Sequence, residues 1–156
     1  MRGKKKYYLT KEGLKKIKKE YQKLLKTKKA VLQKEAPPFL HSEELNTEFI
    51  AFKENSDYLN SRLEELDYIF NNYEIIKKPG SQEERKKVNL GAKVLIEINN
   101  QEDEFMIVGT LEADPSAGKI SNESPVGRAL LGHKEGDEIS ISAPASLTYK
   151  IKKISY

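Results

Sequence analysis

Large apolar residues in the first half of the chain recur at alternating spacings of three and four. One series runs from Leu14 to Val31 and a second from Leu45 to Tyr73. These spacings place side chains along one stripe of a helix, and their seven-residue repeat is typical of helices that pair. Pro37-Pro38 separates the two series, because proline lacks the N–H that a helix interior needs. We therefore predict two helices, capped at Thr10 and Ser42, that form an antiparallel hairpin.

The period changes to two after Pro79-Gly80. Apolar side chains dominate two runs, 94–98 and 104–109, and the Asn99-Asn100 pair between them is typical of a β-hairpin turn. Two further runs, 138–142 and 147–151, alternate between apolar and polar residues. The pattern predicts a second region of antiparallel strands.

A short helix is expected within the strand region. Ser124 suits the N-cap, Pro125 the first helical position and Gly132 the residue after the helix. The predicted fold class is α+β, with an N-terminal antiparallel α-helical coiled-coil hairpin over residues 1–78 and a C-terminal antiparallel β domain with one short helix over residues 79–156. Arms of about 25 residues, at 1.5 Å rise per residue, predict a rod of roughly 40 Å.

Composition narrows the class of protein. With 156 residues, the chain can form one ordinary domain or two small ones. No run approaches the ~18 apolar residues of a membrane span, and the N-terminus lacks the apolar segment of a signal peptide. Cysteine is absent, which excludes disulfides, thiolate catalysis and cysteine-based zinc sites. We expect a cytoplasmic protein that does not associate with membranes.

The net charge of +4 conceals a strong asymmetry along the chain. Residues 1–35 contain 14 basic and three acidic residues, whereas residues 41–74 contain two basic and nine acidic ones. Such asymmetry indicates either a strongly charged partner or two segments that pair with each other. The lysines of the first helix could therefore neutralise the second helix, contact nucleic acid, or do both.

No pairing of a nucleophile with a base is apparent. His41 and His133 lie outside any G-x-S-x-G segment, and no glycine-rich phosphate-binding motif occurs. We therefore expect that the protein is not itself an enzyme. The candidate chemistry lies at the predicted hairpin tip, where Glu43 and Glu44 follow Ser42. Their carboxylates could hold a Mg²⁺ ion that keeps other oxygen ligands, or could simply be favoured in a first helical turn by the helix dipole.

Four segments together carry a recognisable pattern. Two of them are Tyr8–Gly13 and Ala51–Leu66, and a third is Ile107-Val108-Gly109. The fourth and most specific begins at Glu112-Ala113-Asp114-Pro115 and continues from Gly118 to Gly132. Over nearly its whole length the chain resembles the bacterial transcript-cleavage factors of the GreA/GreB family. The resemblance implies an N-terminal coiled coil and a C-terminal FKBP-like domain, in agreement with the patterns above.

The resemblance implies an accessory factor for bacterial RNA polymerase. In that family the globular domain docks at the mouth of the secondary channel and the coiled coil reaches inward. Carboxylates at the tip then help the polymerase site to hold a second Mg²⁺ and a water, so that backtracked RNA is cut. Glu43 and Glu44 are accordingly the candidate catalytic residues and Mg²⁺ ligands, in a site shared with the polymerase. We expect a monomer that binds no Mg²⁺ tightly by itself.

The same resemblance suggests two contact surfaces. Candidate polymerase-binding residues, all in the most specific block, are Asp114, Pro115, Ser124 and Pro125. The basic first helix would face the 3′ end of the nascent RNA, through the candidate residues Lys15, Lys19, Lys23 and Lys26.

The tip departs from the family pattern, which is close to Asp-Leu-Ser-Glu-Asn-Ala-Glu-Tyr. When the two are aligned on Asn46, Ser42 takes the place of the Asp and Leu45 that of the first Glu. Either Glu43 and Glu44 replace the acidic pair with shifted geometry, or cleavage is lost and the protein regulates or inhibits the polymerase by occupying its channel. Relatives of that inhibitory kind are known in this superfamily.

Two other function classes fit less well. A prolyl isomerase or chaperone would need an aromatic-lined pocket, and residues 88–156 supply only Phe105, Tyr149 and Tyr156 as aromatics. A free coiled-coil adaptor would account for the helices but not for the block from Asp114 to Gly132.

Overall fold

The computed structural model describes residues 5–34, 47–142 and 146–156. The chain divides into two compact units: Met1–Gly13 together with Tyr73–Tyr156, and Leu14–Asn72. This division reflects contacts rather than independent folding, so the predicted domain boundary between residues 78 and 79 stays a prediction. Within the described residues, no helix has the length and hydropathy needed to cross a membrane.

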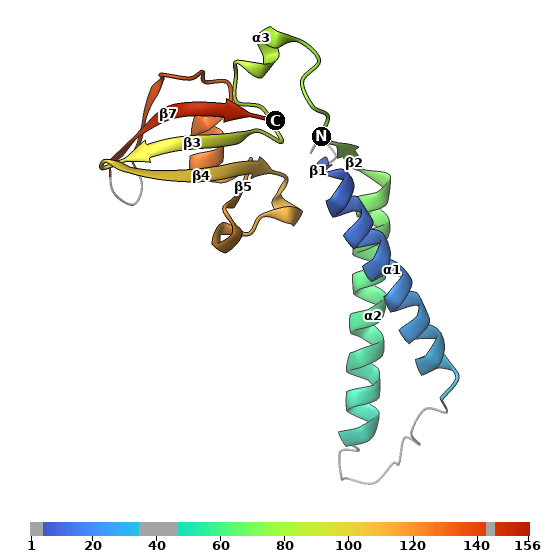
Figure 1. The fold of residues 1–156 in the computed structure, drawn as a ribbon. Helices are drawn as coiled ribbons and strands as arrows, with labels where there is room; N and C mark the ends of the chain where they lie inside the picture. Colours follow the sequence, from blue (N-terminus) through green and yellow to red (C-terminus); the bar gives the residue numbers. More distant parts are fainter. Residues whose placement is uncertain (1–4, 35–46, 143–145) are drawn as a thin grey trace. The chain divides into compact units, whose positions relative to one another are not determined.

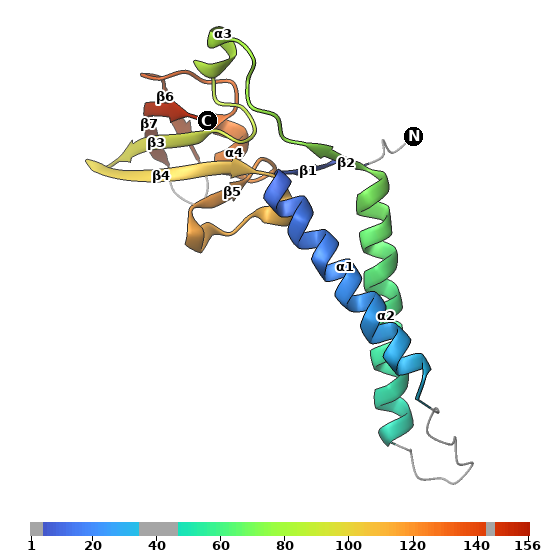
Figure 2. The ribbon, with the colours of Figure 1, turned by 45° about the vertical axis from the view of Figure 1, so that its right-hand side comes forward.

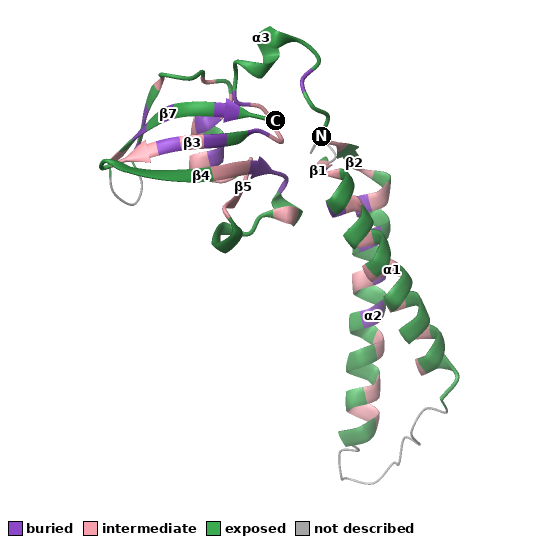
Figure 3. Cartoon of the chain, viewed as in Figure 1, coloured by how far each residue is buried: buried purple, intermediate pink, exposed green. Residues whose placement is uncertain are grey.

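The second unit is the predicted helical hairpin. Its arms are α1 (Lys11–Leu32) and α2 (Thr47–Asn71), which are drawn in blue and green in Figure 1. The apolar stripes face inward: Leu59, Leu63, Leu66 and Ile69 of α2 are buried, and the stripe of α1 is half-buried throughout (Figure 3). The predicted stripes are therefore confirmed over the described residues.

Two side-chain contacts fix the pairing of the arms near the open end of the hairpin. The rings of Tyr21 and Phe70 meet edge to face, with 5.3 Å between their centroids. Arg62 of α2 donates from Nε to Glu20 Oε1 of α1 at 2.8 Å and from Nη1 to Glu65 Oε2 at 2.6 Å. This ion pair links the one arginine of the acidic arm to an acid of the basic arm.

The second helix ends earlier than its periodicity predicts. The Asn71 and Asn72 side chains donate to the carbonyls of Asp67 and Tyr68, and the chain then enters β2 (Tyr73–Ile75). This strand pairs in parallel with β1 (Tyr7–Leu9). Tyr73, predicted as the last member of the helical stripe, is thus an exposed strand residue, because pairing with β1 replaces the last helical turn.

The first unit contains a five-stranded sheet in the order β5-β4-β3-β7-β6. The strands, also seen in Figure 2, are β3 (Lys93–Ile98), β4 (Gln101–Val108), β5 (Lys119–Ser121), β6 (Glu138–Ile141) and β7 (Leu147–Ser155). The β3–β4 hairpin is as predicted, and its turn residues Asn99 and Asn100 have φ values of 50° and 63°. The sheet is mixed rather than wholly antiparallel, because β5 pairs in parallel with β4.

The parallel pair is possible because a crossover separates its strands. Residues between β4 and β5 form two short 3₁₀ turns, η1 (Thr110–Glu112) and η2 (Pro115–Ala117). At the start of this crossover the chain passes close to β1: a Cβ on Gly109 would overlap the carbonyl of Tyr8. A larger residue at position 109 would therefore push β1 away from the crossover.

One hydrophobic core fills the space between the sheet and α4 (Pro125–Leu130). Val94, Ile96, Ile107 and Ile151 from the sheet and Leu130 from α4 are fully buried within it. The predicted helix start is confirmed, because Ser124 Oγ accepts from the N–H of Gly127 at 3.0 Å. A further short helix, α3 (Gln82–Arg85), precedes the sheet.

Candidate functional site

The crossover loop presents the first two predicted polymerase-binding residues, Asp114 and Pro115, at the surface. Asp114 is the N-cap of η2, where its carboxylate accepts from the N–H and the hydroxyl of Ser116. The Ser116 hydroxyl, with the N–H groups of Ala117 and Ser116 and the charge of Lys119, holds the pKa of Asp114 below its usual value. The side chain therefore stays charged at neutral pH while it shapes the loop.

Backbone bonds fasten this loop to β5. Asp114 and Lys119 exchange two bonds, from Asp114 N–H to the Lys119 carbonyl at 2.8 Å and from Lys119 N–H to the Asp114 carbonyl at 2.9 Å. Gly118 closes the turn between them with a φ of 69°. The exposed charge is thus held on a short, fully bonded loop.

The other two predicted residues, Ser124 and Pro125, follow β5 on its other side. The Ser124 hydroxyl donates to the Ser121 carbonyl at 2.7 Å while it caps α4. The hydroxyls of Ser121 and Thr110 lie 3.1 Å apart, which connects β5 to η1. All four predicted residues therefore belong to segments joined through β5.

The four predicted polymerase-binding residues differ in how exposed they are. Asp114, Pro115 and Pro125 are exposed, whereas Ser124 is half-buried and both of its hydroxyl bonds are internal. Leu111 is 38% exposed, which is high for a leucine in a folded unit. The surface available to a partner here combines one carboxylate with proline and leucine side chains, and Ser124 acts as its support.

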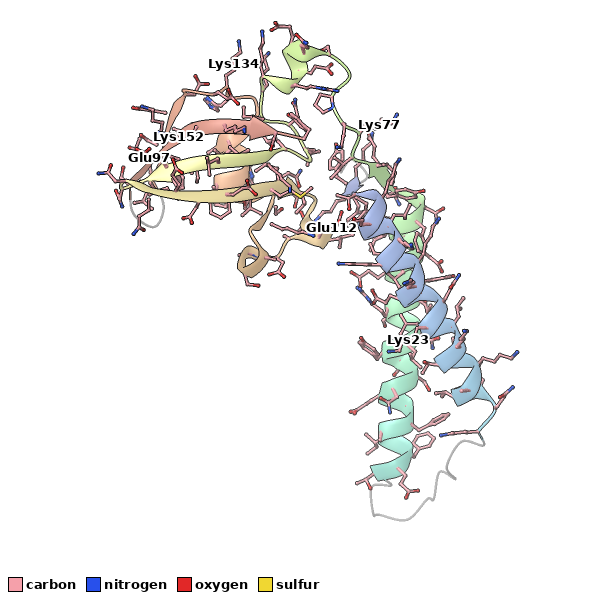
Figure 4. The ribbon with its side chains drawn as sticks, viewed as in Figure 1. Lys23, Lys77, Glu97, Glu112, Lys134 and Lys152 are labelled. Carbon is pink, nitrogen blue, oxygen red and sulfur yellow. The ribbon has the colours of Figure 1, made fainter. Side chains whose placement is uncertain are left out.

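The predicted basic arm lies along α1. Lys15, Lys19, Lys23 and Lys26 are exposed, and Figure 4 labels Lys23. Within the described segments, none of the four forms an ion pair with an acid of α2. The lysines are therefore available to an anionic partner.

The predicted catalytic residues, Glu43 and Glu44, lie outside the described residues, as does the predicted cap Ser42. The described residues contain no group of three or more histidine, aspartate or glutamate side chains arranged to hold a metal ion. The assignment of Glu43 and Glu44 stays a prediction.

A carboxylate that sequence reasoning missed holds the first turn of α1. Glu112 of η1 accepts from the N–H of Thr10 and from the Thr10 hydroxyl, both at 2.6 Å. Thr10 Oγ1 in turn accepts from the N–H of Gly13 at 2.9 Å, which confirms the predicted N-cap. Figure 4 shows Glu112 beside the start of α1.

Gly13 makes room for this arrangement. A Cβ at position 13 would overlap the carboxyl group of Glu112. In a capping box the third residue after the cap is a Glu or Gln that binds the N-cap N–H, and here Gly13 stands at that position. A helix start of the form Thr-x-x-Gly lacks the usual Glu or Gln. This pattern could have indicated that an acidic residue from another part of the chain binds the N-cap N–H.

Comparisons of the sequence with known proteins identify one family. Residues 82–156 match the family described as Transcription elongation factor, GreA/GreB, C-term. Transcription elongation factor GreA of Clostridium acetobutylicum is 36% identical over 159 residues, covering 99% of this chain and 99% of that protein. The protein of the same name from Thermomicrobium roseum is 36% identical over 138 residues, covering 87% and 88%. The crystal structure of GreA factor homolog 1 of Thermus thermophilus matches with a TM-score of 0.42 and 22% identity, covering 97% of this chain and 100% of that one.

Proposed function

Because the chain belongs to the GreA/GreB family of transcription elongation factors, we propose that it binds RNA polymerase at the secondary channel and stimulates cleavage of backtracked RNA. Members of this family are accessory factors and not enzymes themselves. The bonds that break and form would belong to the RNA in the polymerase site. We place its action in the cytoplasm, with the polymerase.

The observation that carries this proposal is the exposed, rigidly bonded Asp114-Pro115 loop. Its carboxylate is engaged by Ser116 and stays charged, so a cationic group on the polymerase would meet a pre-arranged partner. Pre-arrangement lowers the entropy lost on binding. Pro125 and Leu111 add exposed apolar area near the same support.

Mg²⁺ fits the chemistry of the tip residues. Glu43 and Glu44 offer carboxylate oxygens, and Mg²⁺ in phosphoryl chemistry commonly takes one or two such ligands and leaves its other positions to substrate and water. The ion, when bound, supplies charge stabilisation at the phosphate and lowers the pKa of a water. The role of this chain is to bring one or both carboxylates to a site that the polymerase completes.

The basic arm has a separate role in the proposal. Lys15, Lys19, Lys23 and Lys26 are exposed and form no ion pair with another described residue, so they would attract the 3′ segment of RNA displaced by backtracking. Contacts between lysines and phosphates release counterions and weaken steeply with added salt. Crosslinking of the RNA 3′ end to α1 should therefore decrease as salt rises.

A second candidate function is channel occupancy without cleavage. The observation that favours it is the departure at the tip, where Ser42 and Leu45 stand at the positions of the family's acidic pair. In that case the protein would compete with cleavage factors for the channel and slow transcription.

One experiment separates the two functions. A purified backtracked elongation complex, with RNA labelled at its 5′ end, is incubated with the full chain and Mg²⁺. Shortened RNA that can be extended again supports the cleavage function. Intact RNA, together with inhibition of a cleavage-competent factor added at equal concentration, would support occupancy instead. No effect in either assay would contradict both.

A further inference from the structure

A pocket in the first unit combines an apolar floor with a basic rim. Its volume is about 750 Å³, within the range of roughly 300–1,000 Å³ that is usual for ligand pockets. Its lining comes from the start of α1, the residues at the end of β2 and just after it, Leu90 and Gly91 before β3, one face of the sheet, and Tyr156. All of these residues belong to the first unit. We refer to it as the basic pocket.

The sheet wall of the basic pocket is a single cross-strand row. Lys93 of β3 pairs with Met106 of β4, and Met106 pairs with Lys119 of β5. Residues paired in this way point to the same face of a sheet, and successive residues in a strand point to opposite faces. Because Val94 and Ile107 point into the core, the row points away from it. Two ammonium groups thus flank a thioether on the pocket wall.

The rim carries a surplus of positive charge. The charged residues that line the pocket are Lys11, Lys77, Lys78, Lys93, Lys119 and Glu12. Within the described segments none of these lysines forms an ion pair. Lys6 on β1, by contrast, is paired with Glu74 at 3.2 Å. A surplus of positive charge around a concave apolar surface concentrates the field and favours an anionic ligand.

The floor indicates what kind of anion would fit. Ile75, Ile76, Leu90 and Val108 make it mainly aliphatic. The one aromatic of the lining, Tyr156, donates its hydroxyl to the carbonyl of Lys87. Nucleobases are typically held by stacking on aromatic side chains, whereas an aliphatic side chain gains free energy simply by burial here. The lining therefore favours a peptide over a nucleic acid.

The shape of the surface around the basic pocket suits an extended ligand. A second hollow, of about 600 Å³, shares Ile75, Ile76, Lys77 and Leu90 with the basic pocket. Two hollows that share one lining segment suit an extended chain that places side chains in both, as peptide-binding surfaces do.

We propose that the basic pocket binds an acidic peptide segment of a partner protein, with carboxylates at the lysines and a large aliphatic side chain on the floor. This binding goes beyond the function proposed above, because it requires neither the tip glutamates nor the Asp114 loop. If the protein bound no acidic peptide, the result of the cleavage assay would be unaffected. If the cleavage assay failed, the peptide could still bind.

The test is a binding titration with the full chain. The probe is a fluorescein-labelled peptide of alternating glutamate and leucine, followed by fluorescence anisotropy. Replacing its leucines by serine keeps the charge and should weaken binding about fivefold, since the floor then gains no apolar side chain. The variant Lys77→Glu/Lys78→Glu should weaken binding of the leucine peptide about tenfold by reversing two rim charges. Met106→Gln, which makes the sheet wall more polar without changing the charge, should also weaken binding of the leucine peptide.

The matched control is Lys87→Glu/Lys134→Glu, which changes the net charge equally at exposed lysines outside the pocket lining. Figure 4 labels Lys77 and Lys134 on different segments. The control should bind the peptide like the parent, with an unchanged circular dichroism spectrum in every variant. Equal weakening by both double variants, or equal binding of the serine peptide, would overturn the proposal. Oligouridine and inorganic triphosphate are tested as competitors of the labelled peptide. Displacement of the probe by either one, at the concentration at which unlabelled peptide displaces it, would also overturn the proposal.

Discussion

At the scale of single residues, the Glu112 carboxylate is the most consequential group that the structure adds. It satisfies the N-cap N–H and hydroxyl of α1 from 102 residues away. A charged acceptor with two short bonds contributes more to stability than a neutral one.

We predict that Glu112→Ala lowers the free energy of unfolding by about 1–3 kcal/mol, measured by urea denaturation. Glu102→Ala, at an exposed position on β4, is the control and should change it little. An equal effect of both substitutions would show that the bonds from Glu112 to Thr10 do not contribute to stability.

Gly13 and Glu112 are expected to be coupled. Alanine favours a helix over glycine by about 1 kcal/mol, but at position 13 its Cβ would displace the Glu112 carboxyl. We therefore predict that Gly13→Ala destabilises the parent and stabilises Glu112→Ala, in which the obstructing carboxyl is gone. A double-mutant cycle by urea denaturation measures this reversal of sign. The same sign in both backgrounds would contradict the crowded geometry.

Asp114 carries two roles that a substitution can separate. Asp114→Arg reverses the charge but also removes the cap on η2, whereas Asp114→Asn retains an acceptor oxygen for Ser116. If the charge meets a cation on the polymerase, both variants should weaken polymerase binding, Asp114→Arg more strongly. Surface plasmon resonance on purified polymerase measures this. Binding of Asp114→Asn at the parental affinity would leave the loop with a shaping role only.

At the scale of elements, periodicity predicted what is locally encoded and missed what depends on distant pairing. The helical stripes, the Asn99-Asn100 hairpin and the Ser124 cap each have a signal within a few residues. The strands β1, β2 and β5 have three residues each, too few for alternation to show. Their parallel partners lie far away in the chain or across a crossover. The early end of α2 follows from the same long-range pairing.

The turn before β6 should respond to acid. Asp137 accepts from the N–H of Lys134 at 2.8 Å and lies 3.2 Å from His133 Nδ1, and these partners, the Lys134 N–H first, hold its pKa below the ordinary 3.8. A lowered folded-state pKa means that the stabilisation is present above about pH 4 and disappears as the pH falls through the folded value. We predict that Asp137→Asn flattens the loss of stability between pH 4 and pH 2 relative to the parent, followed by thermal unfolding. Asp103→Asn, at an exposed position on β4, should leave the parental pH profile unchanged.

Across the whole molecule, the sequence indicated the family and the block that holds the candidate polymerase-binding residues more readily than the contacts that support them. The motif from Glu112 to Gly132 is contiguous, so it can be read directly. The internal bonds of the Ser124 hydroxyl and the contact between Glu112 and Thr10 depend on how the crossover folds back on β5, β1 and the start of α1. The basic pocket likewise draws its five lysines from four separate places in the chain, which no local pattern brings together.

In the proposed function, Glu43 and Glu44 stimulate cleavage by a polymerase to which the rest of the chain binds. The most direct measurement is the rate of RNA cleavage in a backtracked complex at saturating factor, for the parent and for Glu43→Ala/Glu44→Ala. We predict that the parent accelerates cleavage at least about tenfold, and that the double variant binds the polymerase equally well but gives the factor-free rate, since loss of metal-ligating carboxylates removes a metal-dependent step. Parental acceleration by the double variant, or a parent that binds without acceleration, would contradict this account.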